Sequence, residues 1–227
     1  MAGASTGVAY PLALRTVRAA LAVEPGDRIA DLGAGLGGAS QWLSTTTGAA
    51  VVSVEPSAAS ADAAARLFPE LRMVVADAMA VPITGSSCHA VTLLGVVSLV
   101  DDLAPLLEEA VRLLRPGGRL GLTDLCLVDG DVERPGGGSP NTFRSMDVLV
   151  DALTERGLDV ERLAATDADV DAAWDGVGRE VDDEIRRRHG DDPEFERYRD
   201  DRRRLAARIE DGALHVGTLV ARVRAER

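Results

Sequence analysis

A carboxylate and closely spaced glycines stand together near the start of the chain. In the stretch RIADLGAGLGGASQWLS, Asp31 is followed by Gly33, Gly35 and Gly37. Glycines tolerate positive φ and let a ligand approach the main chain, and the N–H groups that open the following helix attract negative charge. Read through Gly38, the same stretch is also G-x-G-x-x-G, a dinucleotide signature that is weak by itself. The pattern therefore predicts nucleotide binding and leaves the ligand open.

Two acidic residues narrow the choice of ligand, because each ends an expected strand. A carboxylate at Asp31 would crowd a pyrophosphate, but it suits a ligand with an ammonium or sulfonium group nearby. Glu55 is placed to accept hydrogen bonds from two ribose hydroxyls, which fits either ligand. The charge of Asp31 therefore argues against a dinucleotide.

These residues require a scaffold of alternating strands and helices. Short apolar, valine-rich segments indicate buried strands of a mostly parallel sheet covered on both faces. We expect strands at 28–32, 49–55, 71–77, 89–97, 118–128, 158–167 and 213–224. Helices are expected at 11–23, from the glycine loop through Trp42, and at 58–68, 103–114 and 145–157, with strongly charged helical sequence over 170–211. A turn at RPGG is expected to separate the helix 103–114 from the next strand.

Four motifs follow one another at regular spacing: DLGAGLG, VVSVEPS, VVADAMAVP and LLRPGGRLGLTD. On these motifs, the chain from residue 28 to about 124 resembles the class I S-adenosylmethionine-dependent methyltransferases. The resemblance is strongest to the small-molecule group that includes ubiquinone/menaquinone-biosynthesis-like and glycine/sarcosine-type enzymes. It implies S-adenosyl-L-methionine as cofactor, S-adenosyl-L-homocysteine as product and a small-molecule acceptor.

The resemblance also implies a fold. We expect an α/β, Rossmann-like sheet of seven strands, mostly parallel, in the order 3-2-1-4-5-7-6 with strand 7 antiparallel. The expected single domain, 1–227, has an N-terminal helical cap (1–27), a cofactor-binding core (28–129) and a C-terminal part (130–227). A lid-like helical insertion at about 170–211 would lie between strands 6 and 7.

Candidate site residues fall into three groups. For the cofactor we expect contacts from Asp31, Gly33, Ala34, Gly35, Gly37, Glu55, Pro56, Asp77, Ala78 and Gly95. For the acceptor the candidates are Tyr10, Ser98, Asn141, Phe143 and Arg144. Catalytic candidates that hold or deprotonate the acceptor are Asp124 and His189. Many relatives carry a histidine or an aromatic pair after the fourth strand, whereas this chain has GVVSLVDD, so the acceptor stays open.

The expected reaction is in-line displacement of a methyl group from a sulfonium to an O, N or C atom, which needs positioning and exclusion of water more than a covalent intermediate. Two alternatives stay open. One is a non-methylating protein that binds the same cofactor, such as a decarboxylase, a cyclase or a regulatory module. The other is a nicotinamide-dependent oxidoreductase.

Composition excludes several other classes. The net charge of -12 disfavours nucleic acid as a partner. No apolar run reaches the roughly 18 residues of a membrane span, and no secretory signal is evident, so we expect no membrane association and a cytoplasmic location. Cys88 and Cys126 lack metal-ligand spacing, so no metal site is expected. A homodimer remains an open expectation.

Overall fold

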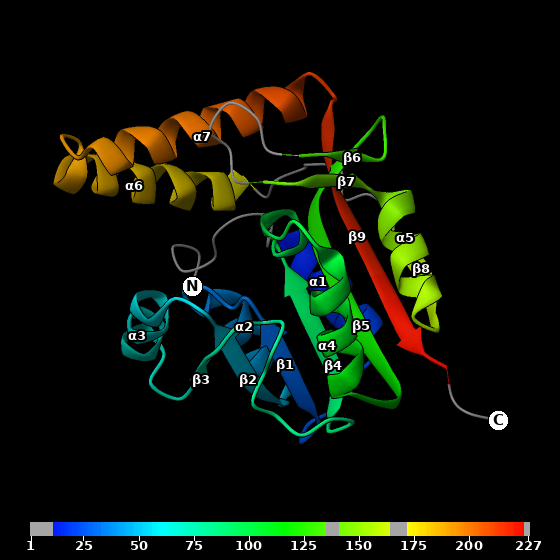
Figure 1. Ribbon diagram of the computed structural model, residues 1–227. Helices are drawn as coiled ribbons and strands as arrows, with labels where there is room; N and C mark the ends of the chain where they lie inside the picture. The colour runs from blue at the N-terminus through cyan, green and yellow to red at the C-terminus, as the bar shows by residue number, and fades with distance from the viewer. Residues whose placement is uncertain (1–10, 135–140, 164–171, 225–227) are drawn as a thin grey trace.

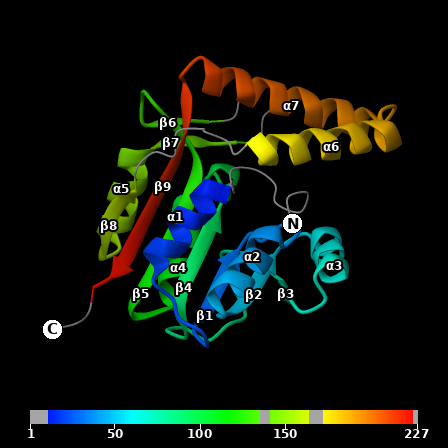
Figure 2. The same ribbon diagram turned by 180° about the vertical axis from the view of Figure 1, so that it is seen from behind.

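Helices cover both faces of a central sheet (Figures 1 and 2). The computed structural model describes residues 11–134, 141–163 and 172–224. The helices α4 and α5 pack on one face, whereas α1 and α2 pack on the other. The helices are α1 (Pro11–Leu21), α2 (Gly38–Thr47), α3 (Ala58–Leu67), η2 (Val97–Leu99, one 3₁₀ turn), α4 (Leu103–Leu113), α5 (Met146–Glu155), α6 (Ala172–His189) and α7 (Pro193–Glu210).

The sheet has the expected order with two short additions. Its strands are β1 (Arg28–Leu32), β2 (Ala50–Glu55), β3 (Arg72–Val75), β4 (Cys88–Leu94), β5 (Leu114–Leu127), β6 (Val132–Glu133), β7 (Phe143–Ser145), β8 (Leu158–Leu163) and β9 (Leu214–Val223). The order β3-β2-β1-β4-β5 continues through β9 to β8, and β9 is antiparallel to both of its neighbours. The predicted order 3-2-1-4-5-7-6 is therefore confirmed, with β8 and β9 as the sixth and seventh strands.

The strand count differs from seven because β6 and β7 extend the sheet locally. β4 pairs with β5 as far as Thr123, and β7 then pairs in parallel with Cys126 and Leu127. β9 occupies the other edge of β5 from Arg119 to Leu127, so β7 takes the edge that β4 has left. Asp124 and Leu125 lie in the interval between the two pairings, where the backbone edge of β5 is open to neighbouring loops.

The RPGG segment is part of β5 and does not stand apart from it as a turn. β5 begins at Leu114, directly after α4, and its register with β4 shifts between Cys88 and Ala90. Gly117 has a φ of 75°, which a residue without Cβ adopts readily. The expected break is therefore an irregularity within a longer strand.

The charged segment near the C-terminus forms two long helices, α6 and α7, that lie side by side at the end of the sheet near β6 and β7 (Figure 1). Leu205 and Ile209 of α7 pack against a small apolar cluster that includes Phe143 and Leu214. Arg208 fixes the same end of α7, since its guanidinium pairs with Glu133 at 2.7 and 2.8 Å. Among residues 11–134, 141–163 and 172–224, no helix is long and apolar enough to cross a membrane.

Candidate active site

A cavity of about 470 Å³ opens at the carboxyl ends of the parallel strands. Ligand sites in open α/β sheets lie at this edge because the loops after the strands converge there. Most of the residues expected from the sequence line this cavity: Asp31, Gly33, Ala34, Gly35, Glu55, Pro56, Asp77, Ala78, Gly95, Ser98, Asp124 and Asn141. The sequence motifs, which are far apart in the chain, therefore meet in one place.

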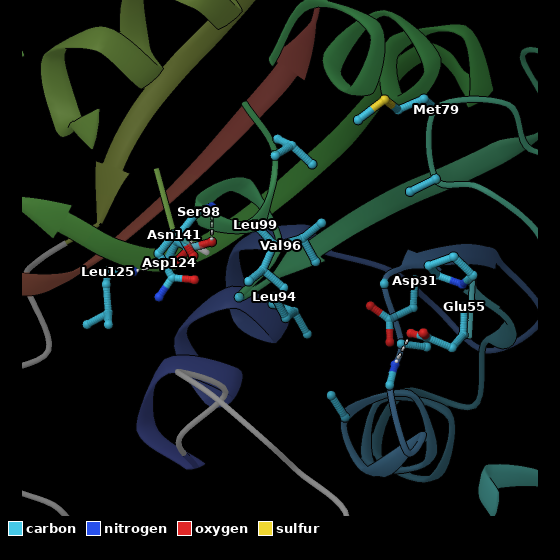
Figure 3. A pocket seen from close by; sticks show the side chains of 18 of the residues that line it. Asp31, Glu55, Met79, Leu94, Val96, Ser98, Leu99, Asp124, Leu125 and Asn141 are labelled. Atoms are coloured by element: carbon cyan, nitrogen blue, oxygen red, sulfur yellow. Dashed lines mark hydrogen bonds between the residues drawn. The ribbon is translucent and has the colours of Figure 1, made fainter. Parts of the chain in front are cut away.

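The cavity has two ends (Figure 3). Asp31 and Glu55 lie close together at one end, and Ser98, Asp124 and Asn141 gather at the other. Leu94 and Val96, from the end of β4 and the loop that follows it, lie between the two groups. The first end carries the glycine loop, and the second is built from the segment after β4, from Asp124 and Leu125 within β5, and from Asn141 before β7.

The glycine loop folds as the motif requires. Gly33 and Gly35 have φ values of 76° and 55°, and the N–H groups of Gly33 and Ala34 donate to the carbonyl of Val54 at 2.8 and 2.9 Å. A Cβ added to Gly33 would lie 2.6 Å from Cγ2 of Val96. Contacts this short force neighbouring atoms to move, so glycine is needed here to keep the cavity open.

Glu55 ties this loop to the end of β2. Its Oε2 accepts a hydrogen bond from the N–H of Gly35 at 2.8 Å, and its Oε1 accepts one from the N–H of Ser57 at 2.9 Å. A carboxylate has about four acceptor positions, so both oxygens keep capacity for a ligand hydroxyl. Glu55 therefore stabilises the glycine loop and can also bind a ligand in the cavity.

Asp31 is held rigidly beneath the loop and is only 1% exposed. Its two oxygens accept hydrogen bonds from the hydroxyls of Ser40 at 2.5 Å and Thr92 at 2.7 Å. Burial raises the pKa of this carboxyl, and the two hydroxyl donors offset part of that effect. A positive charge bound in the cavity would favour the ionised form.

Asp124 is the corresponding carboxylate at the other end of the cavity. Its Oδ2 accepts from the N–H of Ser98 at 3.1 Å, and its Oδ1 accepts from the N–H of Leu125 at 2.8 Å. Burial raises the pKa of Asp124, while these donors act in the opposite direction. A carboxylate of this kind is a stronger base than one in water.

The pKa of Asp124 makes a testable contribution to stability. Because the folded-state pKa lies above the ordinary value of 3.8, the folded protein binds the proton more readily than the unfolded chain does. The free energy of unfolding contributed by Asp124 therefore falls as the pH rises from 3.8 through the folded-state pKa. Urea unfolding at about pH 4.5 and about pH 7.5 should show wild type losing stability relative to Asp124→Asn as pH rises. A difference that stays constant or reverses its sign would contradict this assignment.

Arg144 does not line the cavity, although it was an acceptor candidate. Its guanidinium is 5% exposed and donates to the carbonyls of Val97, Thr142, Val100 and Asp101 at 2.7–3.1 Å. All but the carbonyl of Thr142 belong to the segment after β4, which carries cavity residues. Arg144 therefore holds that segment in shape.

Of four other candidates, three do not line the cavity and one lies outside the residues that the structure describes. Gly37 caps α2, and a Cβ there would meet Leu71 at 2.8 Å, so its role is packing. Phe143 is buried, with the guanidinium of Arg208 at 5.1 Å from its ring centroid. His189 is exposed at the end of α6 and does not line the cavity. Tyr10 lies outside the described residues.

The sequence reasoning missed the apolar part of the cavity wall. Leu205 of α7 lines the cavity, and no signal in its charged surroundings indicates this. In the segment GVVSLVDD the sequence indicated Gly95 and Ser98, whereas Val96, Leu99 and Val100 also line the cavity. The apolar lining residues that were missed are Ala39, Met79, Leu94, Val96, Leu99, Val100, Leu125 and Leu205.

Comparison with known proteins gives matches over the same core. Residues 30–122 match the family model described as a methyltransferase domain. A demethylmenaquinone methyltransferase of Beutenbergia cavernae is 38% identical over 101 residues, which are 44% of this chain and 42% of that protein. An O-methyltransferase of Pyrenophora dematioidea is 29% identical over 112 residues, 47% of this chain and 42% of that protein. The aligned regions thus span less than half the length of these relatives.

Solved structures resemble nearly the whole chain. The [4+2]-cyclase SpnF superimposes with a TM-score of 0.70 at 18% identity, covering 94% of this chain and 81% of that one. Phosphoethanolamine N-methyltransferase 2 of Haemonchus contortus, in complex with S-adenosyl-L-methionine, gives 0.67 at 18% identity, covering 95% and 52%. At these identities the likeness establishes the shared fold.

Proposed function

We propose that this chain binds S-adenosylmethionine in the cavity and transfers its methyl group to a small-molecule acceptor, and the match of residues 30–122 to the methyltransferase-domain family supports this proposal. The observation that carries the proposal is the convergence of Glu55, Asp31 and the loop of Gly33 and Gly35 on one cavity. The carboxylates of Asp31 and Glu55 attract a positively charged nucleoside, and the glycines of the loop allow it to approach the main chain.

The residues present fit the cofactor. Glu55 keeps acceptor capacity for the ribose hydroxyls, and Gly33 and Gly35 present main chain without Cβ to the cavity. Asp77 lines the cavity after β3 and accepts from the N–H of Met79 at 2.9 Å, which fixes its carboxylate near the place expected for the adenine. Asp31 supplies negative charge beneath the loop.

Bound there, the cofactor supplies an activated methyl group on a positively charged sulfur. The chain's contribution is to hold the accepting atom roughly 3–3.5 Å from that carbon and to exclude water. We propose Asp124 as the group that receives the acceptor's proton, because it faces the cavity and burial raises its pKa. A positioned base of this kind accelerates such reactions about 10² to 10⁴-fold.

Replacing Glu55 with glutamine tests the cofactor assignment without removing the side chain. The amide keeps one acceptor oxygen but presents N–H donors to the N–H of Gly35 or Ser57, so the loop and the ribose contact both suffer. We expect affinity for S-adenosylhomocysteine to fall by more than about 1 kcal/mol, measured by calorimetry. Glu70→Gln, at an exposed site outside the cavity, is the control and should bind as wild type does. Wild-type affinity in Glu55→Gln would place the nucleoside elsewhere.

Methyl transfer itself is tested by incubating the protein with methyl-labelled S-adenosylmethionine and a panel of small metabolites, followed by mass spectrometry. We expect labelled product from one class of acceptor, and none from the Glu55→Gln variant at low cofactor concentration. Binding of the cofactor without transfer to any metabolite would favour a non-methylating protein, a possibility that the fold of the cyclase relative illustrates. Binding of NAD with no binding of S-adenosylhomocysteine would favour an oxidoreductase.

A further inference from the structure

The distribution of charge around the cavity restricts what can bind beside the cofactor. Four carboxylates, Asp31, Glu55, Asp77 and Asp124, line the described cavity, and no arginine or histidine does. Building on the proposed function, we infer that the acceptor is a neutral, largely apolar molecule that presents a hydroxyl group to Asp124. Acceptors that carry a phosphate or carboxylate group are excluded by this inference.

The parts of the chain whose side chains are not described add almost no positive charge. The sequence contains no lysine, so arginine and histidine supply all its side-chain cations. Residues 1–12 and 135–140 contain no charged side chain, and residues 164–178 contain aspartate as their only charged type. Arg179 and Arg227 are the only cationic side chains among the undescribed ones. The sequences of these segments therefore offer no cluster of cationic side chains.

Main-chain groups do not replace the missing cation at the Asp124 end. The N–H of Ser98, which faces this end, already donates to Asp124, and the N–H of Thr142 donates to the carbonyl of Ser98 at 2.7 Å. The nearby start of α4 is capped by the carboxylate of Asp102, which accepts from the N–H of Ala104 at 3.0 Å. An anion here would lose its hydration beside a buried carboxylate, which is strongly unfavourable without a partner.

Arg144, a described cation that interacts with Asp124, is already committed to other partners. Arg144 donates to four main-chain carbonyls and does not line the cavity. Releasing it toward a ligand would leave those carbonyls without a donor. A buried acceptor left unsatisfied costs about 1–3 kcal/mol, so recruitment of Arg144 by an anionic acceptor is unfavourable.

The remaining wall at this end is apolar. Leu99, Val100, Leu125 and Leu205 line it, and Leu99 is 60% exposed, which gives the entrance an apolar surface in the absence of ligand. Burial of such surface favours an apolar body at about 25 cal/mol per Å². A hydroxyl is preferred over an ammonium as the reacting group, because a protonated amine has no free electron pair with which to accept the methyl group, and the sulfonium of the cofactor offsets part of the attraction of the carboxylates for a second cation.

Asp124 supplies the polar contact that a hydroxyl needs. The main chain of Val97, Ser98 and Leu125 and the hydroxyl of Ser98 hydrogen-bond to this carboxylate, and the O–H of an acceptor would take the place of the Ser98 hydroxyl. On transfer, the acceptor oxygen forms the new bond to carbon as the bond from carbon to sulfur breaks, and the proton of the hydroxyl passes to Asp124. The sulfur leaves as a neutral thioether, so atoms and charge balance.

Binding of matched probes tests this inference. Protein saturated with S-adenosylhomocysteine is titrated with 1-naphthol, 1-naphthyl phosphate and 1-naphthoic acid, and affinities are measured by calorimetry and ligand-observed NMR. We expect 1-naphthol to bind at least about tenfold more tightly than either anionic probe. Equal or tighter binding of the phosphate or carboxylate would overturn the inference, as would absence of 1-naphthol binding at about millimolar concentration.

A charge added at the entrance should change the preference in a defined direction. Leu99→Arg is expected to increase the affinity for 1-naphthyl phosphate by about fivefold or more and to lower that for 1-naphthol, because it adds a charge and removes part of the apolar wall. Leu67→Arg adds the same charge at a 55% exposed site on α3 outside the cavity and should change neither. An equal effect of Leu99→Arg and Leu67→Arg on the affinity for 1-naphthyl phosphate would show that the probe responds to the net charge of the protein. It would contradict the assignment of Leu99 to the wall of the acceptor site.

The same titrations separate this inference from the proposed function. Absence of S-adenosylhomocysteine binding to wild type would overturn the proposed function and the acceptor class with it. Binding of S-adenosylhomocysteine together with a preference for the anionic probes would overturn only the acceptor class.

Discussion

Gly33→Ala should lower the affinity for S-adenosylhomocysteine at least about a hundredfold, since the alanine both displaces Val96, which lines the cavity, and strains the loop. Its Cβ would lie 2.6 Å from Cγ2 of Val96, a stiff, β-branched side chain that turns aside only at a cost. The φ of 76° adds about 1–2 kcal/mol of strain for a residue with a Cβ. Calorimetric titration of the purified variant measures the effect.

Gly130→Ala separates the two causes. Gly130 has a φ of 83°, but a Cβ there meets no atom within 4 Å. This variant should therefore lose about 1–2 kcal/mol of stability and keep wild-type affinity. If Gly33→Ala bound S-adenosylhomocysteine as tightly as wild type does, the nucleoside would not bind against Gly33.

Replacing Arg144 with methionine should lower the free energy of unfolding by about 3 kcal/mol or more. Methionine fills similar space without a donor, so four main-chain carbonyls lose their charged partner in a buried region. Chemical denaturation measures the loss, and hydrogen exchange should show faster exchange at the N–H of Ser98 because the segment after β4 loosens.

Arg162→Met provides the matched control. Arg162 is about half exposed and pairs with Asp147 at the surface, so its replacement should change stability by less than about 0.5 kcal/mol. A loss below about 1 kcal/mol in Arg144→Met would mean that water or other donors satisfy these carbonyls, and that Arg144 is not the residue that holds the segment.

The sequence predicted the parts of the fold that follow from local pattern. Valine-rich runs closed by glycine or an acidic residue marked the parallel strands, and the amphipathic segment 145–157 marked α5. The short strand β7 was missed, because three residues, Phe143–Ser145, carry too little pattern. Its position depends on β4 ending at Leu94 while β5 continues, which is a tertiary relation.

The cofactor end of the site was also predictable, and the acceptor end was not. Asp31, Gly33 and Glu55 belong to short motifs, and each motif can be recognised from the local sequence without knowledge of the tertiary structure. Leu205 reaches the cavity only because α7 packs its apolar side chains on the sheet end. Arg144 looked like a substrate contact from its charge, whereas its burial among carbonyls makes it a structural donor.

The most direct test of the cofactor site is a crystal structure of the protein with S-adenosylhomocysteine. We expect the nucleoside against the loop of Gly33 and Gly35, with its ribose hydroxyls within hydrogen-bond distance of Glu55. Electron density for the nucleoside at any other place, with this cavity empty, would contradict the assignment.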